Sequence, residues 1–215
     1  MRDIVPYFPR GAIHLVVVDP GVGTERRPMI LRTGWLMAVG PDNGVLSLLW
    51  EGDRQASFFQ IDEAAVARGP VSSTFHGRDL FAPAAALLAT GVKPEELGDP
   101  LPDPVELELP LPVREQDVLL GEVLYHDRFG NLVTNIRRDH LPGDPQDLLV
   151  EIGGRTTRGL VRTYAHGGAG LIALIGSTGL LEIAVRKGSA YETLRADFGT
   201  KVRVSVLERR RTTGR

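Results

Sequence analysis

The sequence predicts an α/β N-terminal domain followed by an all-β, barrel-like C-terminal domain. In the first half of the chain, apolar strand-like runs alternate with segments of helical spacing, which is typical of α/β layers. In the second half, short β-type runs follow one another between glycine-containing turns, which is typical of a small barrel or sandwich. We therefore expect an α/β domain over residues 1–99, a proline-rich linker over 100–116 and a barrel-like domain over 117–215.

Five segments make up the predicted α/β part. Residues 12–18 are apolar and rich in valine, which predicts a strand buried on both faces inside a sheet. Two further strands are expected around residues 29–31 and 35–39. The apolar spacing of residues 44–50 and of the alanine-rich segment 78–90 predicts helices.

The linker and the barrel-like part have a different composition. Five prolines lie between Gly98 and Pro112, and neither a helix interior nor a central strand tolerates such a density. Beyond them, six strand-like runs are expected, at residues 118–125, 132–136, 148–152, 171–175, 181–185 and 202–207.

Composition narrows the class of protein. The 215-residue chain has a formal net charge of -2 and no sustained basic stripe, which argues against a nucleic-acid partner. The absence of cysteine excludes disulfides, thiolate metal sites and cysteine nucleophiles. Because no apolar run approaches the roughly 20 residues that span a bilayer, and no signal peptide is visible, we expect no membrane association and a cytoplasmic location.

Asp19 is the first candidate for chemistry. It directly follows the predicted strand 12–18, and open α/β sheets bind ligands beyond the carboxyl ends of their strands. A turn-forming aspartate before Pro20-Gly21 is an equally good interpretation of this residue alone. Arg26 lies seven residues later, after a glycine-bearing loop, where it can fold back and keep Asp19 ionised.

His76 is the second candidate, at the start of the predicted helix 78–90. A helix N-terminus disfavours the imidazolium, so a neutral His76 able to accept a proton is one interpretation, and a packed or surface histidine is the other. Asp79 follows, and a metal hydrolase using Asp19, His76 and Asp79 is a further hypothesis. It ranks last because the spacing of these residues matches no metal-binding motif.

Two turns of the barrel-like part carry polar side chains. Asp127-Arg128-Phe129-Gly130-Asn131 ends one predicted strand, and Gly176-Ser177-Thr178-Gly179 separates two others. Each segment fits a plain hairpin turn, and each also fits a loop that presents a polar ligand-binding surface.

The motifs taken together closely resemble the SAM hydroxide adenosyltransferase family, which is related to the SAM-dependent fluorinase and chlorinase. They occur in family order along nearly the whole chain, at residues 18–24, 41–44, 74–79, 127–135 and 175–184. The resemblance implies an α/β domain, a β-barrel domain and a homotrimer that holds S-adenosyl-L-methionine (SAM) between neighbouring subunits. It also implies hydrolysis of SAM to adenosine and L-methionine, with SAM as substrate, no cofactor and no metal.

The resemblance also assigns roles to particular residues. Asp19, Arg26 and His76 match the catalytic triad that holds the attacking water. Asp127 and Ser177 match positions at the methionine end of SAM, and Asn131 and Tyr164 match positions around the adenine. Phe129 resembles part of the wall of that pocket, and Val185 is a further substrate-binding position.

One family feature has no match. Family members begin with a strand and a Thr-Asp-Phe-Gly type motif whose aspartate binds the ribose hydroxyls, so we expect that segment to be missing here. A non-catalytic remnant that binds SAM or a nucleoside is therefore an alternative to the hydrolase. A SAM-dependent halogenase ranks lower, because the halogenases lack the Asp–Arg–His set.

Overall fold

The computed structural model describes residues 4–50, 52–166, 168 and 170–207. The chain divides into two compact units, Met1–Glu108 and Leu109–Arg215, which we call the first and the second unit. Strands β5 (Gly98–Pro100) and β6 (Val113–Glu115) overlap the stretch expected to be a linker. The domain boundaries expected at residues 99 and 116 stay predictions.

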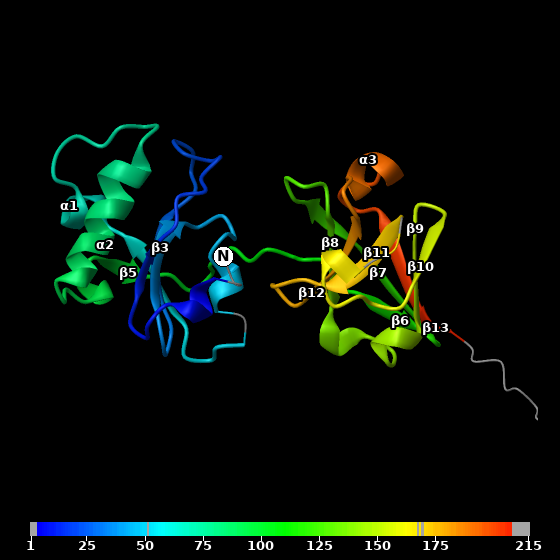
Figure 1. Cartoon of the computed structure of the whole chain (residues 1–215). Coiled ribbons are helices and arrows are strands. Elements are labelled where there is room, and N and C mark those ends of the chain that lie inside the picture. The colour runs from blue at the N-terminus through cyan, green and yellow to red at the C-terminus, as the bar shows by residue number, and fades with distance from the viewer. Residues whose placement is uncertain (1–3, 51, 167, 169, 208–215) are drawn as a thin grey trace, which may run out of the picture. The chain divides into compact units, whose positions relative to one another are not determined.

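A five-stranded mixed sheet forms the centre of the first unit, with the order β1-β3-β2-β4-β5 (Figure 1). Strand β1 pairs parallel with β3, and the other pairs are antiparallel. This confirms the strands expected around residues 29–31 and 35–39, whereas β4 was not predicted. The bounds are Ile13–Leu15 for β1, Pro28–Arg32 for β2, Met37–Pro41 for β3 and Ser57–Ile61 for β4.

Both faces of this sheet are covered, which explains the unbroken apolar run of β2. Met29 and Leu31 point to a cluster that includes Trp50, whereas Ile30 between them points to the helical side. Helices α1 (Glu63–Val66) and α2 (Ala82–Ala89) lie together on that side, as Figure 1 shows. The central strands of the sheet are therefore buried on both faces.

The helix expected at 78–90 is confirmed, as a π-type turn at Gly77–Phe81 that continues into α2. The helix expected at 44–50 is wrong: the structure has one 3-10 turn there, Ser47–Leu49. Gly44 has a φ of +89°, a left-handed conformation that does not continue as a right-handed helix. The Ser47 hydroxyl donates to the Gly44 carbonyl instead, at 2.7 Å.

The prediction that residues 12–18 form an interior strand buried on both faces is also wrong. Strand β1 covers only Ile13–Leu15 and lies at one end of the sheet, among the described strands. Leu15, Val17 and Val18 are exposed, while Val16 is buried. An apolar, β-branched run has the same composition on an edge as inside a sheet, because β-propensity measures local fit and not position.

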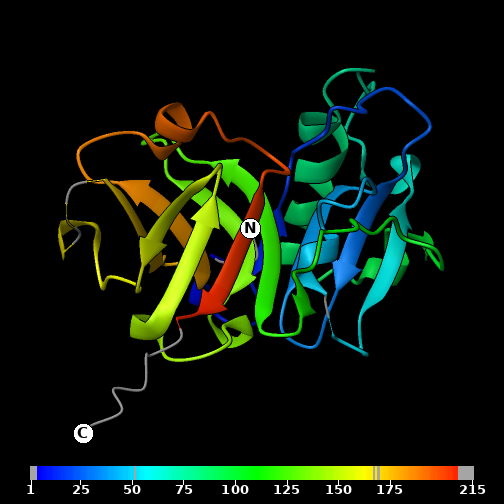
Figure 2. The ribbon, with the colours of Figure 1, turned by 90° about the vertical axis from the view of Figure 1, so that its right-hand side faces the viewer.

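The second unit is a strongly curved antiparallel sheet with the order β10-β9-β13-β7-β8-β12-β11, with β6 paired to β7 (Figure 2). The sheet nearly closes on itself, because Leu160, just after β10, bridges to Ala173 of β11. All six predicted strands are confirmed; β6, β10 and helix α3 (Ala190–Leu194) were not predicted. The bounds are Val118–His126, Leu132–Arg137, Leu148–Ile152, Arg155–Arg158, Leu171–Ile175, Leu180–Val185 and Lys201–Val206 for β7 to β13.

The core of the second unit lies inside this curved sheet. Leu181 and Ile183 of β12 belong to that core, together with Leu132 and Val150. Glu182 and Ala184 point to the other face of the same strand, since side chains alternate along a strand. None of the helices in the described ranges has the length and apolar character that crossing a membrane requires.

Candidate functional site

Asp19, Arg26 and His76 come together in the first unit. Arg26 donates from Nε to Asp19 Oδ1 at 2.9 Å and from Nη2 to Asp19 Oδ2 at 2.5 Å. The same Nη2 lies 2.7 Å from His76 Nδ1. The side chains of Arg26 and Asp19 are only 8% and 6% exposed, so this is a buried, bidentate ion pair with an imidazole attached to it.

Two glycines allow the segments that carry these residues to approach each other. Gly23 has a φ of +78°, and a Cβ there would lie 2.6 Å from the Ser73 carbonyl oxygen. A Cβ on Gly77 would lie 2.8 Å from a methyl carbon of Val17. Any larger residue at either position would push the segment of His76 away from the segment of Asp19 and Arg26.

The strand end before Asp19 is fixed by its neighbours. Val16 N donates to Val39 O at 2.8 Å, which continues the pairing of β1 with β3 past Leu15. Asn43 Nδ2 then donates to the Val18 carbonyl at 2.9 Å. Asp19 therefore starts its loop directly after a backbone segment that is hydrogen-bonded to its neighbours.

Arg26 is held on its other side by an aromatic ring. Its guanidinium carbon lies 5.1 Å from the ring centroid of Phe81 in the π-type turn. The Nη1 atom is buried and has no hydrogen-bond partner among the described residues. Phe81 is itself fully buried, so the arginine is clamped between a carboxylate, an imidazole and a ring.

Asp79 does not join this group. Its Oδ1 accepts from Arg78 Nε at 2.7 Å, and its Oδ2 accepts from Ser72 N at 2.8 Å. The Arg78 guanidinium beside it holds the pKa of the Asp79 carboxyl below its usual range. Within the described part of the chain, no three histidine, aspartate or glutamate side chains are grouped to hold a metal ion.

A second group of predicted residues lines a pocket of about 720 Å³ in the second unit. Asp127, Phe129, Asn131, Tyr164 and Val185 all lie on its wall, as the resemblance implied for one common ligand. Four residues that the sequence analysis did not single out complete it: Ala165, Arg186, Lys187 and Gly188. A wall with two aromatic rings, an amide and charges of both signs suits a planar, zwitterionic molecule.

Asp127 has a structural role in that wall. Its Oδ1 accepts from the backbone N of Phe129 and of Asn131, both at 2.9 Å, and its Oδ2 accepts from Asn131 Nδ2 at 2.9 Å. The hairpin-turn interpretation is therefore correct for this segment. It does not exclude a ligand, because each carboxylate oxygen accepts more than one hydrogen bond.

Tyr164 is tied to a buried carboxylate that the sequence analysis missed. Its hydroxyl donates to Glu182 Oε2, and Glu182 is only 7% exposed on the outward face of β12. Burial, followed by the hydrogen bond to Glu182, raises the pKa of Tyr164 above its usual range. A Cβ on Gly176 would clash with Glu182 Oε1, so this turn needs glycine to make room for the carboxylate.

One predicted site residue lies apart from the pocket. Ser177 is exposed in the turn between β11 and β12 and is not among the lining residues.

The signal for Glu182 was present in the sequence, because a single charge interrupts the apolar run of residues 180–185. A charged side chain in a buried strand usually has a partner, and here the partner is the Tyr164 hydroxyl.

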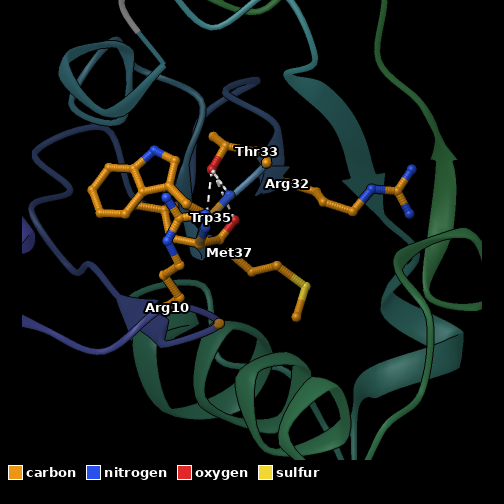
Figure 3. A pocket seen from close by; sticks show the side chains of 8 residues that line it. Arg10, Arg32, Thr33, Trp35 and Met37 are labelled. Carbon is orange, nitrogen blue, oxygen red and sulfur yellow. Dashed lines mark hydrogen bonds between the residues drawn. The ribbon is translucent and has the colours of Figure 1, made fainter.

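A hollow of about 240 Å³ lies in the first unit beside the turn between β2 and β3 (Figure 3). Its lining includes Arg10, Thr33 and Trp35. The Thr33 hydroxyl is used by the turn itself, since it accepts from Trp35 N and Leu36 N. Arg32 points away to Ser57 and Glu95. None of the predicted site residues lies here.

Comparison with known proteins gives consistent matches. The model of the SAM hydroxide adenosyltransferase N-terminal domain matches residues 1–98, and that of the C-terminal domain matches residues 121–203. The chain is 43% identical over 210 residues to a Thermus thermophilus protein named (R)-S-adenosyl-L-methionine hydrolase, covering 94% of this chain and 79% of that protein. A protein of the same name from Salinispora tropica is 38% identical over 96% of this chain and 79% of its own length.

A solved structure has a similar fold over nearly the whole chain. The crystal structure of an uncharacterized conserved protein from Thermotoga maritima superposes with a TM-score of 0.83 at 35% identity, covering 95% of this chain and 82% of that one. Family models and relatives therefore agree over both units of the fold, and the chain belongs to the SAM hydroxide adenosyltransferase family.

Proposed function

We propose that this protein hydrolyses SAM to adenosine and L-methionine, by attack of water on the 5′ carbon of the adenosyl group. The observation that carries the proposal is the buried Asp19–Arg26–His76 group, in a chain of this family. These are the three residues that the resemblance assigned to holding the attacking water.

The reaction is within reach of such a group. The oxygen of water forms a bond to C5′ while the C5′–S bond breaks, and the electron pair stays on sulfur. The leaving group is the neutral thioether of methionine, so it needs no proton from the protein. One proton is released for each SAM consumed. The protein has to orient one water molecule and keep others away, and orientation of this kind supplies much of an enzyme's rate.

The pocket of the second unit supports the choice of substrate. Phe129 and Tyr164 offer ring faces for the adenine, and Asn131 offers an amide for its edge. We propose that the Asp127 carboxylate binds the ammonium group of the methionine part of SAM. We propose that the Ser177 hydroxyl also binds the methionine part, as a neutral hydrogen-bonding group. Val185 gives an apolar contact at the same wall.

The remaining parts of the proposal concern assembly and requirements. We propose a homotrimer in which the triad and the pocket act on one SAM molecule, a cytoplasmic location, and a reaction that uses no cofactor or metal. Light scattering on the purified protein measures the oligomeric state. Activity that survives exhaustive chelation supports the last point, and activity lost to chelation would revive the metal hydrolase.

The test is chromatography of SAM incubated with the purified protein. Both sulfonium epimers should be supplied, because the names of the two hydrolase relatives specify the (R) form. Formation of adenosine and methionine in equal amounts supports the proposal. Binding of SAM without turnover favours the non-catalytic remnant, and a halogenated adenosine formed with fluoride or chloride favours the halogenase.

A further inference from the structure

We propose that Asp42 and Asn43 act as positioning residues for the reaction, by holding the two ends of one loop. This loop covers residues 19–26, from Asp19 to Arg26, and we call it the triad loop. The inference rests on the proposed hydrolysis of SAM and adds two residues to it. Both residues lie in a motif of the family resemblance to which the proposed reaction gives no role.

The backbone hydrogen bonds inside the triad loop are local. Thr24 N, for example, donates to the Gly21 carbonyl at 3.2 Å. Such a turn fixes the path of a few residues, and the Asp19–Arg26 ion pair joins the two ends of the loop. Where the joined pair lies relative to His76 depends on the backbone just before and just after the loop.

Asn43 holds the start of the triad loop. Its Nδ2 donates at 2.9 Å to the carbonyl of Val18, the residue before Asp19. Val45 N donates to Asn43 Oδ1 at 3.1 Å, which fixes the amide with its donor toward Val18. The orientation of the amide is therefore set on one side and used on the other.

Asp42 holds the end of the triad loop. Its Oδ2 accepts at 2.8 Å from Nε of Arg27, the residue after Arg26. Its backbone N also donates to the Arg27 carbonyl, at 2.9 Å. The Asp42 side chain is 1% exposed and that of Arg27 is 28% exposed, so water and salt screen this pair little.

The two holding residues come from one piece of backbone. Asp42 and Asn43 directly follow β3, which pairs with both β1 and β2. Val18 lies three residues after β1, and Arg27 directly precedes β2. One turn therefore fixes both ends of the triad loop relative to the sheet. A displacement of about 1 Å in such a group can lower a rate about 100-fold.

The contacts of Asp42 make it a positioning residue and not a group that touches the substrate. Its second oxygen, Oδ1, accepts from Val105 N at 2.7 Å, so both oxygens are engaged within the first unit. Arg27 also donates from Nη1 to Asp103 Oδ1 at 2.7 Å, and the Asp103 side chain is 74% exposed. The same guanidinium thus has one buried and one exposed carboxylate, which supplies a matched control.

The first experiment separates kcat from KM for SAM. Asp42→Ala removes the holder of the loop end, and Asn43→Asp replaces the donor to Val18 by a carboxylate oxygen. Each should lower kcat about 10–100-fold. KM should stay within about threefold, because the pocket of the second unit is unchanged. Asp103→Ala, the control on the exposed side, should keep kcat within about twofold.

The second experiment uses trypsin, without SAM. Trypsin cleaves after arginine, and the Arg26 side chain is only 8% exposed, so cleavage there requires the triad loop to open. Cleavage after Arg32, within β2, requires the sheet to open and is the internal reference. Asp42→Ala and Asn43→Asp should raise the initial rate after Arg26, relative to that after Arg32, about fivefold or more. Asp103→Ala should leave this ratio unchanged.

Several outcomes would overturn the positioning role. These are a cleavage ratio equal to that of the original protein, an equal rise at both arginines, and an open loop with unchanged kcat. A rise in KM alone would assign the two residues to substrate binding and would also overturn it. If Asp42→Ala does not fold, Asn43→Asp carries the test, since Asn43 is only half-buried. If the original chain forms no adenosine, the proposed hydrolysis fails, and the trypsin ratio alone still decides whether the two residues hold the loop.

Discussion

The two units present their predicted site residues in opposite ways. In the first unit, Asp19 and Arg26 are almost fully buried and bonded to each other, with His76 attached. In the second unit, the rings that line the pocket are open, with Phe129 81% and Tyr164 43% exposed. The positions of Asp19, Arg26 and His76 are thus set by contacts within the fold. The rings of Phe129 and Tyr164 instead keep exposed surface that a ligand can cover.

The largest effect is expected from breaking the buried pair in the first unit. Arg26→Ala leaves the Asp19 carboxylate buried without its partner, which typically costs about 3–5 kcal/mol of folding free energy. Both tryptophans, Trp35 and Trp50, lie in the first unit, so tryptophan fluorescence during urea unfolding reports this unit alone. We expect its midpoint to fall strongly.

The matched control for this variant is Arg78→Ala. Arg78 also forms an ion pair, with Asp79, but its side chain is 68% exposed. Exposed pairs contribute little, so its midpoint should stay close to that of the original protein. Equal shifts for the two variants would mean that burial does not distinguish the pairs, and the comparison of the units would lose its basis.

The second expected effect is on binding in the pocket. Asp127→Ala removes the anion proposed to meet the methionine ammonium, and should weaken SAM binding about 10–100-fold, as loss of a charged hydrogen bond does. Titration calorimetry measures the dissociation constant. A value equal to that of the original protein would contradict the role.

Asp127 also holds its own turn, so the variant needs a control that keeps the turn. Asp127→Asn retains an oxygen for the backbone N–H groups of Phe129 and Asn131, and removes the charge together with the acceptor for Asn131 Nδ2. If charge matters, Asn weakens binding nearly as much as Ala. If Asn binds like the original residue, Asp127 acts through the turn alone.

The same comparison shows what the sequence could predict. The six strands of the second unit were predictable, because their alternating or continuous apolar runs are local signals bounded by turns. The edge position of β1 was not, because Leu15 and Val17 have the composition of a buried strand although they are exposed. Strand order depends on pairing between distant segments, which local composition does not encode.

The candidate site divides in the same way. Asp19, Arg26 and His76 could be named from motifs, but their contact depends on the close approach of Gly23 to Ser73 and of Gly77 to Val17. Neither approach is visible in the spacing of 50 residues between Arg26 and His76. Glu182 was missed because its role exists only through Tyr164, which reaches it from a separate turn.

A moderate effect is expected from the hydrogen bond between Tyr164 and Glu182. Tyr164→Phe removes the donor and frees the ring, which should raise KM for SAM about 2–10-fold and leave kcat nearly unchanged. Glu182→Gln keeps the shape of the acceptor and should have a smaller effect. The double variant should cost less than the sum of the two, because both remove one interaction. Strict additivity of the KM changes would show that the two side chains act independently.

The smallest effect concerns His14, which like Arg26 has a buried side-chain nitrogen without a hydrogen-bond partner among the described residues of the first unit. Its Nε2 is buried without a partner among the described residues, and its ring meets that of Phe8 edge-on, with centroids 5.1 Å apart. Burial lowers the pKa of His14 from its ordinary value of 6.5. As the pH falls through 6.5, the unfolded chain therefore gains a proton that the folded unit does not, and the folded state loses stability. Well above that pH the ring is neutral in both states, so none of this stability is lost.

His14→Leu should flatten this acid loss when the tryptophan-detected urea midpoint is followed from pH 7.5 to about pH 5. An acid slope equal to that of the original protein would assign the loss to other groups, and the unpaired nitrogen of His14 would then carry no measurable cost in the folded unit.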